Sequence, residues 1–122
     1  MNRRFRLTRS TNFERVRRLG KSYAHPLIVL IVLPNRAEKT RIGVAAGRSV
    51  GNAVRRNRAK RLLRHAIQQV LPVMKPGWDV VLIARRTMAE ATFQQTVAAL
   101  AALLGRAKLL QEVHDINSQP PG

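Results

Sequence analysis

The sequence predicts an α/β (α+β) two-layer sandwich, in which a small mixed sheet packs with three helices in the order α-β-β-α-β-α. Three segments repeat apolar residues at helical spacing, and three short apolar segments, two of them rich in β-branched residues, lie between turn residues. The chain has 122 residues and a hydrophobic fraction of 45%, which suits one domain with a core. We expect a single domain over residues 1–113 and a disordered tail over 114–122.

The amino-terminal part predicts a short helix over about residues 10–19. Thr11 and Glu14 have the Ser/Thr-x-x-Glu spacing of a capping box. An apolar stripe and a terminating glycine complete the pattern: Phe13, Val16 and Gly20.

Three segments predict strands: residues 27–33, 40–46 and 78–84. The first is apolar at every position and is closed by Pro34, so we expect a central strand buried on both faces. The second carries apolar residues in period two, and we expect it to return antiparallel beside the first as a hairpin. The third follows a Lys-Pro-Gly turn.

A basic helix is predicted between the second and third strands, over about residues 53–70. Asn52 is a plausible N-cap, and Pro72 stops the pattern. At ~100° per residue one face is apolar, comprising Ala59, Leu62, Leu63, Ala66 and Val70. The other face is polar and basic, comprising Asn57, Lys60, Arg61 and Arg64. A last helix is predicted from Thr92 to about Val113.

The charge balance indicates a polyanionic partner. Lys and Arg number 23, Asp and Glu only 6, and the formal net charge is +17, so nucleic acid is the favoured partner. The longest apolar run, residues 27–33, is far short of the ~20 residues of a membrane span, so no membrane partner is expected. The chain has no cysteine, and no apolar stretch follows its first basic residues, so we expect a cytoplasmic protein.

The acidic and histidine residues do not indicate a polypeptide active site. Nucleases that hold metal ions cluster two or more carboxylates. Here the six acids are scattered, and the three histidines lie far apart in the sequence. We therefore expect no catalytic residue and no metal ligand in the polypeptide. Gly43, Gly47 and Gly51 lack the spacing of a phosphate-binding loop and are interpreted as turn glycines.

Charge alone leaves the kind of nucleic acid open, since a basic helix also suits a ribosomal or nucleoid protein. Asn57 lies among arginines, and its amide can both donate to and accept from a phosphate or a ribose hydroxyl. The alternative is that Asn57 is merely exposed.

The stretch of residues 51–64, Gly-Asn-Ala-Val-Arg-Arg-Asn-Arg-Ala-Lys-Arg-Leu-Leu-Arg, resembles the signature of the bacterial ribonuclease P protein subunit. The resemblance is centred on the triplet Arg56-Asn57-Arg58. It extends to Arg6-Leu7, Phe13, the segment 41–44, the segment 84–86 and the helix that contains Phe93. Only the tail lies outside it.

This resemblance implies the small protein cofactor of a ribozyme that removes the 5′ leader of precursor tRNA. The RNA subunit would perform the hydrolysis and hold most of the magnesium, and no organic cofactor is expected. The partners implied are the catalytic RNA and precursor tRNA, with no DNA. The family fold also implies an uncommon left-handed β-α-β crossover around the basic helix, against the usual right-handed rule.

The resemblance further implies two groups of binding residues. The basic helix would contact RNA through Arg55, Arg56, Asn57, Arg58, Lys60, Arg61 and Arg64. A cleft for the leader would involve Phe13, Arg17, Ile31 and Arg48. Phe13 suits both a core stripe and a base-stacking role. Arg17 and Ile31 stand where some relatives have aromatic residues, so the resemblance implies a different leader preference for this chain. A ribosomal protein and an autonomous nuclease remain alternatives, which processing activity would separate.

Overall fold

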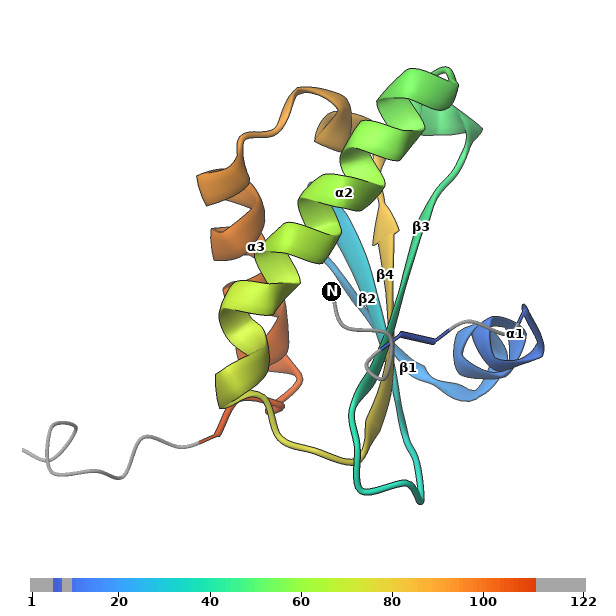
Figure 1. The fold of residues 1–122 in the computed structure, drawn as a ribbon, viewed down its shortest axis with the longest axis vertical. Helices are drawn as coiled ribbons and strands as arrows, with labels where there is room; N and C mark the ends of the chain where they lie inside the picture. Colours follow the sequence, from blue (N-terminus) through green and yellow to red (C-terminus); the bar gives the residue numbers. More distant parts are fainter. Residues whose placement is uncertain (1–5, 8–9, 112–122) are drawn as a thin grey trace, which may run out of the picture.

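A computed structural model describes residues 6–7 and 10–111, which form a four-stranded sheet with helices on both faces (Figure 1). The helices are α1 (Ser10–Leu19), α2 (Ala53–Val70) and α3 (Phe93–Arg106). The strands are β1 (Lys21–Ala24), β2 (Ile28–Pro34), β3 (Arg41–Ala46) and β4 (Trp78–Ala84). Short 3-10 turns connect them: η2 (Arg48–Val50), η3 (Leu71–Val73) and η4 (Arg86–Glu90).

The strand order is β1-β2-β4-β3, so the predicted hairpin between residues 27–33 and 40–46 is wrong. β4 lies between β2 and β3, antiparallel to the first and parallel to the second. β4 is apolar on both faces over most of its length and is buried by a neighbour on each side, whereas β3 carries Arg41 and Gly43 and lies at the edge. β1, which the sequence analysis missed, is a mostly exposed strand at the other edge.

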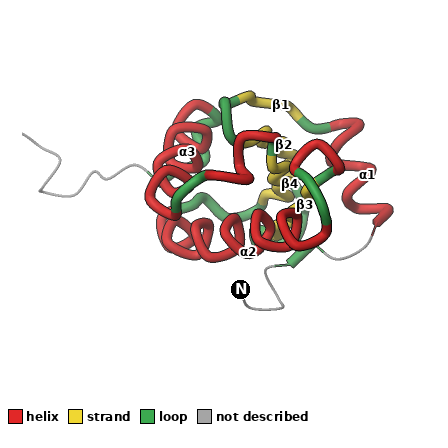
Figure 2. Tube along the Cα trace, turned by 90° about the horizontal axis from the view of Figure 1, so that it is seen from above, coloured by secondary structure: helices red, strands yellow, loops and turns green. Residues whose placement is uncertain are grey.

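The connection from β3 through α2 to β4 is a left-handed crossover. In Figure 2, with β3 and β4 running towards the viewer, the chain passes from β3 to α2 and on to β4 clockwise. A clockwise path towards the viewer is left-handed, which is the rare hand for this unit. The crossover expected from the resemblance is therefore present, and it sets α2 across β3 at the edge of the sheet.

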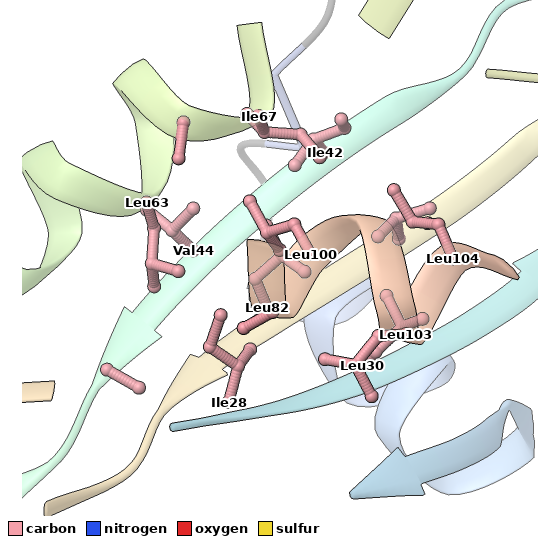
Figure 3. Close-up of a cluster of buried hydrophobic side chains, with 14 of the residues drawn as sticks. Ile28, Leu30, Ile42, Val44, Leu63, Ile67, Leu82, Leu100, Leu103 and Leu104 are labelled. Carbon is pink, nitrogen blue, oxygen red and sulfur yellow. The ribbon is translucent and has the colours of Figure 1, made fainter. Parts of the chain in front are cut away.

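The main core lies between the sheet and the layer of α2 and α3 (Figure 3). Alternate residues of the strands, such as Leu30 and Leu82, point into it and meet Leu63 of α2 and Leu100 of α3. α2 has the predicted bounds, and Asn52 caps it by accepting a hydrogen bond from the backbone N–H of Arg55 at 3.0 Å. The buried face of α2 is Ala59, Leu63, Ala66, Ile67 and Val70, with Leu62 half-buried beside it.

The opposite face of the sheet is covered by α1, the one helix on that side in the part of the chain that the structure describes (Figure 2). Its apolar contacts form a second, smaller cluster: Leu7, Val16, Ile31 and Val81. The helix begins at Ser10, so Thr11 lies inside its first turn and not at the N-cap position. α1 is therefore fixed to the sheet by far fewer buried side chains than α2 and α3.

The last helix starts as expected and ends earlier. Thr92 and Gln95 form a capping box, with Thr92 Oγ1 accepting from the backbone N–H of Gln95 at 3.1 Å. α3 ends at Arg106, because the chain turns through a left-handed Lys108 and Leu110 then pairs with Met74. The predicted end at residue 113 and the predicted tail over 114–122 lie outside the described residues.

Candidate nucleic-acid interface

The basic side chains of α2 differ in how far they are buried. Arg55, Arg58 and Arg61 are exposed, as is Asn57, whereas Arg56, Lys60 and Arg64 are half-buried along the flanks of the helix. Apolar residues of the same helix are anchored in the core, so the exposed cations stand on a rigid support. α2 therefore presents a row of positive charge suited to a phosphate backbone.

Arg58, the third residue of the triplet, is held by the protein itself. Its guanidinium donates hydrogen bonds to the carbonyl oxygens of Met88 at 3.4 Å, Ala89 at 3.1 Å and Ala91 at 3.0 Å. These carbonyls belong to η4 and to the residue that follows it. Arg58 thus ties α2 to the connection between β4 and α3, a role that the sequence analysis did not anticipate.

A cleft of about 240 Å³ lies at the β3 edge of the sheet, between α1 and α2. Its lining combines an aromatic ring, two guanidinium groups and apolar strand residues: Arg6, Leu7, Phe13, Ile42, Gly43, Val44 and Arg64. The segment of Arg6 and Leu7 pairs with β3, where the backbone N–H of Leu7 donates to the carbonyl of Ile42 at 2.9 Å. Arg6 and Leu7 thereby form one wall of the cleft.

Gly43 determines where the ring of Phe13 lies. A Cβ atom at Gly43 would stand 2.3 Å from Cζ of Phe13, so only glycine leaves room for the ring against β3. Gly43 is in the middle of a strand, and its interpretation as a turn glycine is wrong. Gly51 does lie in a turn, with a φ of 133° that favours glycine.

The two cations of the cleft repel one another. Burial, and secondly the charge of Arg6, lowers the pKa of Arg64 from its ordinary value. No acidic residue is among the described residues that line this cleft. An anionic group placed between Arg6 and Arg64 would remove the repulsion, so the electrostatics of the cleft favour an anionic ligand.

The other expected cleft residues lie apart from this lining. Ile31 is only 6% exposed and is buried under α1 with Val16, so it does not line the cleft. Arg17 is exposed on α1, and Arg48 is exposed on η2. The structure thus brings Phe13 and Arg64 together at the cleft, whereas Arg17 and Arg48 are exposed cations outside its lining.

A second hollow, of about 540 Å³, lies at the start of α2. It is lined by residues of η2, α2 and η4: Ser49, Val50, Gly51, Arg55, Arg86, Thr87, Ala89 and Glu90. The backbone N–H groups at the start of α2 and the side chains of Arg55 and Arg86 make this hollow largely positive, with one carboxylate at its rim. It continues the basic surface of α2 towards η4.

The described residues hold neither a metal-type cluster nor a membrane-spanning helix. Within the ranges 6–7 and 10–111, no three His, Asp or Glu side chains come together as a metal site. In the same part of the chain no helix has the length and apolar character needed to cross a membrane.

Sequence reasoning missed three residues that shape the interface. Arg6 and Gly43 line the cleft or make room in it, and Asp79 is a buried acid beneath α1. A glycine in the middle of an apolar strand is a known signal of close approach, and could have indicated Gly43. A lone acid at the start of an apolar strand carries no comparable signal, since its partners lie 38 to 64 positions away.

The fold and the interface define a small basic α+β protein with an edge cleft beside a cationic helix. The profile of the family described as Ribonuclease P matches residues 1–108. The "Ribonuclease P protein component" of Herpetosiphon aurantiacus is 42% identical over 109 residues, 89% of each chain, and that of a Roseiflexus species is 38% identical over 112 residues, 91% of this chain and 92% of its own.

Solved structures agree with this result. The ribonuclease P protein of Staphylococcus aureus has a TM-score of 0.79 at 27% identity, covering 88% of this chain and 98% of its own. That of Thermotoga maritima has a TM-score of 0.75 at 28% identity, covering 83% and 96%. The chain belongs to the ribonuclease P protein family, the protein components of a ribonucleoprotein endoribonuclease. The resemblance found in residues 51–64 is thereby confirmed.

Proposed function

We propose that the chain binds the catalytic RNA of ribonuclease P through α2, binds the 5′ leader of precursor tRNA in the cleft at the β3 edge, and so promotes endonucleolytic removal of the leader. The observation that carries the proposal is the cleft itself, where Phe13 and the two guanidinium groups of Arg6 and Arg64 converge. Family membership supports the reaction. The geometry supports assigning the catalytic RNA to α2 and the leader to the cleft.

The cleft has the chemistry that single-stranded nucleic acid requires. Unpaired bases stack on aromatic rings, and the backbone phosphates pair with cations beside them. Phe13 offers the ring, and a leader phosphate between Arg6 and Arg64 would relieve their mutual repulsion. A duplex would hide its base faces from Phe13, so the single-stranded leader suits the cleft better than the paired part of the tRNA.

The exposed cations of α2 suit a folded RNA. Arg55 and Arg61 stand on an 18-residue helix anchored by its apolar face, so they can contact successive phosphates without reorganisation. In this proposal the catalytic RNA performs the hydrolysis and holds the magnesium ions that the reaction uses. The protein lowers the repulsion between the two RNAs, needs no organic cofactor, and acts in the cytoplasm with neither DNA nor membrane as a partner.

The test is cleavage of a 5′-extended precursor tRNA at low magnesium concentration, with the protein alone, the catalytic RNA alone and both together. Cleavage at the mature 5′ end only in the mixture supports the proposal. Activity of the protein alone would show an autonomous nuclease, and RNA binding with no stimulation would indicate a structural RNA-binding protein such as a ribosomal component.

A further inference from the structure

Asp79 stands out as a buried charge beneath α1. Its side chain is 0% exposed, and its carboxylate accepts four hydrogen bonds from three separate segments. Arg41 of β3 donates two of them, from Nε and Nη2, each at 2.9 Å. Arg15 of α1 donates one from Nη2 at 2.8 Å, and Asn35, after β2, donates one from Nδ2 at 2.8 Å.

This cluster is costly to build for stability alone. A buried ion pair has to offset the desolvation of its charges, and apolar side chains of similar size are often as stabilising. The cluster instead gives a precise orientation. Hydrogen bonds depend on direction, so four of them to one carboxylate restrict where their donor groups can lie. The arrangement here fixes α1, β3 and the end of β2 relative to one another.

α1 needs such a restraint. Val16 is its one side chain that is fully buried among those the structure describes, so apolar contact leaves the rotation of the helix weakly determined. Arg15 is the neighbour of Val16 in the chain and is only two positions from Phe13. Fixing the guanidinium of Arg15 on Asp79 therefore fixes the direction in which Phe13 leaves the helix.

The same carboxylate also acts on the strand that receives Phe13. Arg41 and Gly43 are two positions apart on β3 and lie on the same face of the sheet. Asp79 holds the Arg41 side chain with two hydrogen bonds, while the ring of Phe13 lies over Gly43. Asp79 thus holds α1 and β3, the helix and the strand that shape the cleft, in fixed positions relative to each other.

We propose that Asp79 is a positioning residue for leader binding: through Arg15 and Arg41 it holds α1 so that Phe13 faces the cleft. The inference rests on the proposed function of that cleft. Asp79 does not touch the leader in this arrangement, and it engages two basic side chains, Arg15 and Arg41, that stay partly exposed.

The first experiment compares Arg15→Ala with Arg18→Ala in the holoenzyme reconstituted with the catalytic RNA. Each variant removes one cation from α1, but Arg18 is exposed and is three residues from the Asp79 contact. The readout is the ratio of affinities for precursor tRNA with a long leader and with a one-nucleotide leader. We expect Arg15→Ala to lower this ratio about tenfold, the scale of one lost base stack, with little change in Arg18→Ala.

The second experiment is a cycle of Asp79→Asn and Phe13→Ala. Asparagine keeps the shape of Asp79 and removes its charge, and circular dichroism reports whether the variant stays folded. If Asp79 acts through Phe13, Asp79→Asn lowers the long-leader preference in the wild-type background and has no further effect when Phe13 is already alanine. A merely structural loss would lower affinity for both leaders and would add to the effect of Phe13→Ala.

Two outcomes would overturn the inference in distinguishable ways. If Phe13→Ala lowers the long-leader preference while Arg15→Ala matches Arg18→Ala, the cleft binds the leader and Asp79 does not position it. If Phe13→Ala leaves the preference unchanged although the holoenzyme still cleaves, the leader does not use this cleft, and the proposed function fails together with the inference.

Discussion

The two faces of the sheet are closed by different means. The face under α2 and α3 is covered by the large apolar core, with Leu63, Ile67 and Leu100 fully buried in it. The face under α1 has four buried apolar residues and the hydrogen-bonded carboxylate of Asp79. Apolar packing is strong but tolerant of direction, whereas hydrogen bonds are weak and specific in direction. The first face therefore sets stability, and the second sets the position of the cleft.

The largest expected effect is on the first face. Leu63→Ala removes a side chain with 0% exposure from the centre of the main core and is expected to lower the free energy of unfolding by about 2–5 kcal/mol. Urea denaturation measures this loss. Leu62→Ala, on the same helix but half-buried, is the control and should cost clearly less.

Gly43→Ala tests the close contact between β3 and α1. The added methyl group would overlap the ring of Phe13, so the ring must move or the helix must shift, at a cost of about 1–3 kcal/mol. We expect weaker binding of long-leader precursor tRNA and unchanged binding of the catalytic RNA, measured by titration of each RNA. Gly47→Ala is the matched control, since no atom lies within 4 Å of a Cβ there. Equal effects of the two variants would contradict the proposal that the Phe13 ring, packed against Gly43, forms part of the leader cleft.

Val16→Ala probes the small cluster under α1. It removes two carbon atoms from a fully buried site, and we expect a loss of about 1–2 kcal/mol, below that of Leu63→Ala. Thermal unfolding provides the measurement. A loss as large as that of Leu63→Ala would break the comparison, because α1 would then be part of the same cooperative core.

Arg58 and Arg61 give the smallest contrast, within α2 itself. Arg58→Ala removes hydrogen bonds to three carbonyl oxygens and is expected to cost about 1 kcal/mol of stability. Arg61→Ala should leave stability unchanged and make the salt dependence of RNA binding shallower by about 0.7–0.9 per lost phosphate contact. Measuring both variants by thermal unfolding and by a salt titration separates the two roles. A larger salt effect for Arg58→Ala would place its guanidinium on the RNA.

The sequence by itself determined the local structure and the family. Asn52 caps α2 as predicted, because an N-cap bond joins residues only three positions apart. The last helix begins at the position predicted, and Thr92 caps it there. The bounds of α2 and its apolar face follow from a periodicity contained within one helix. The motif of residues 51–64 identified the family for the same reason, since it is a short contiguous stretch.

Only the tertiary structure decided the order of the strands and the composition of the cleft. β3 pairs with β4 and not with β2, since the apolar strand β4 is buried by a neighbour on each side. No local sequence pattern indicates which strand that neighbour is. Phe13 meets Gly43 and Arg64, and Asp79 meets Arg15 and Arg41, across separations that single-chain periodicity cannot express. Local hydrogen bonds and helical spacing depend on residues close together in the sequence. Strand order and burial depend on contacts between distant segments that can pack on the same sheet face.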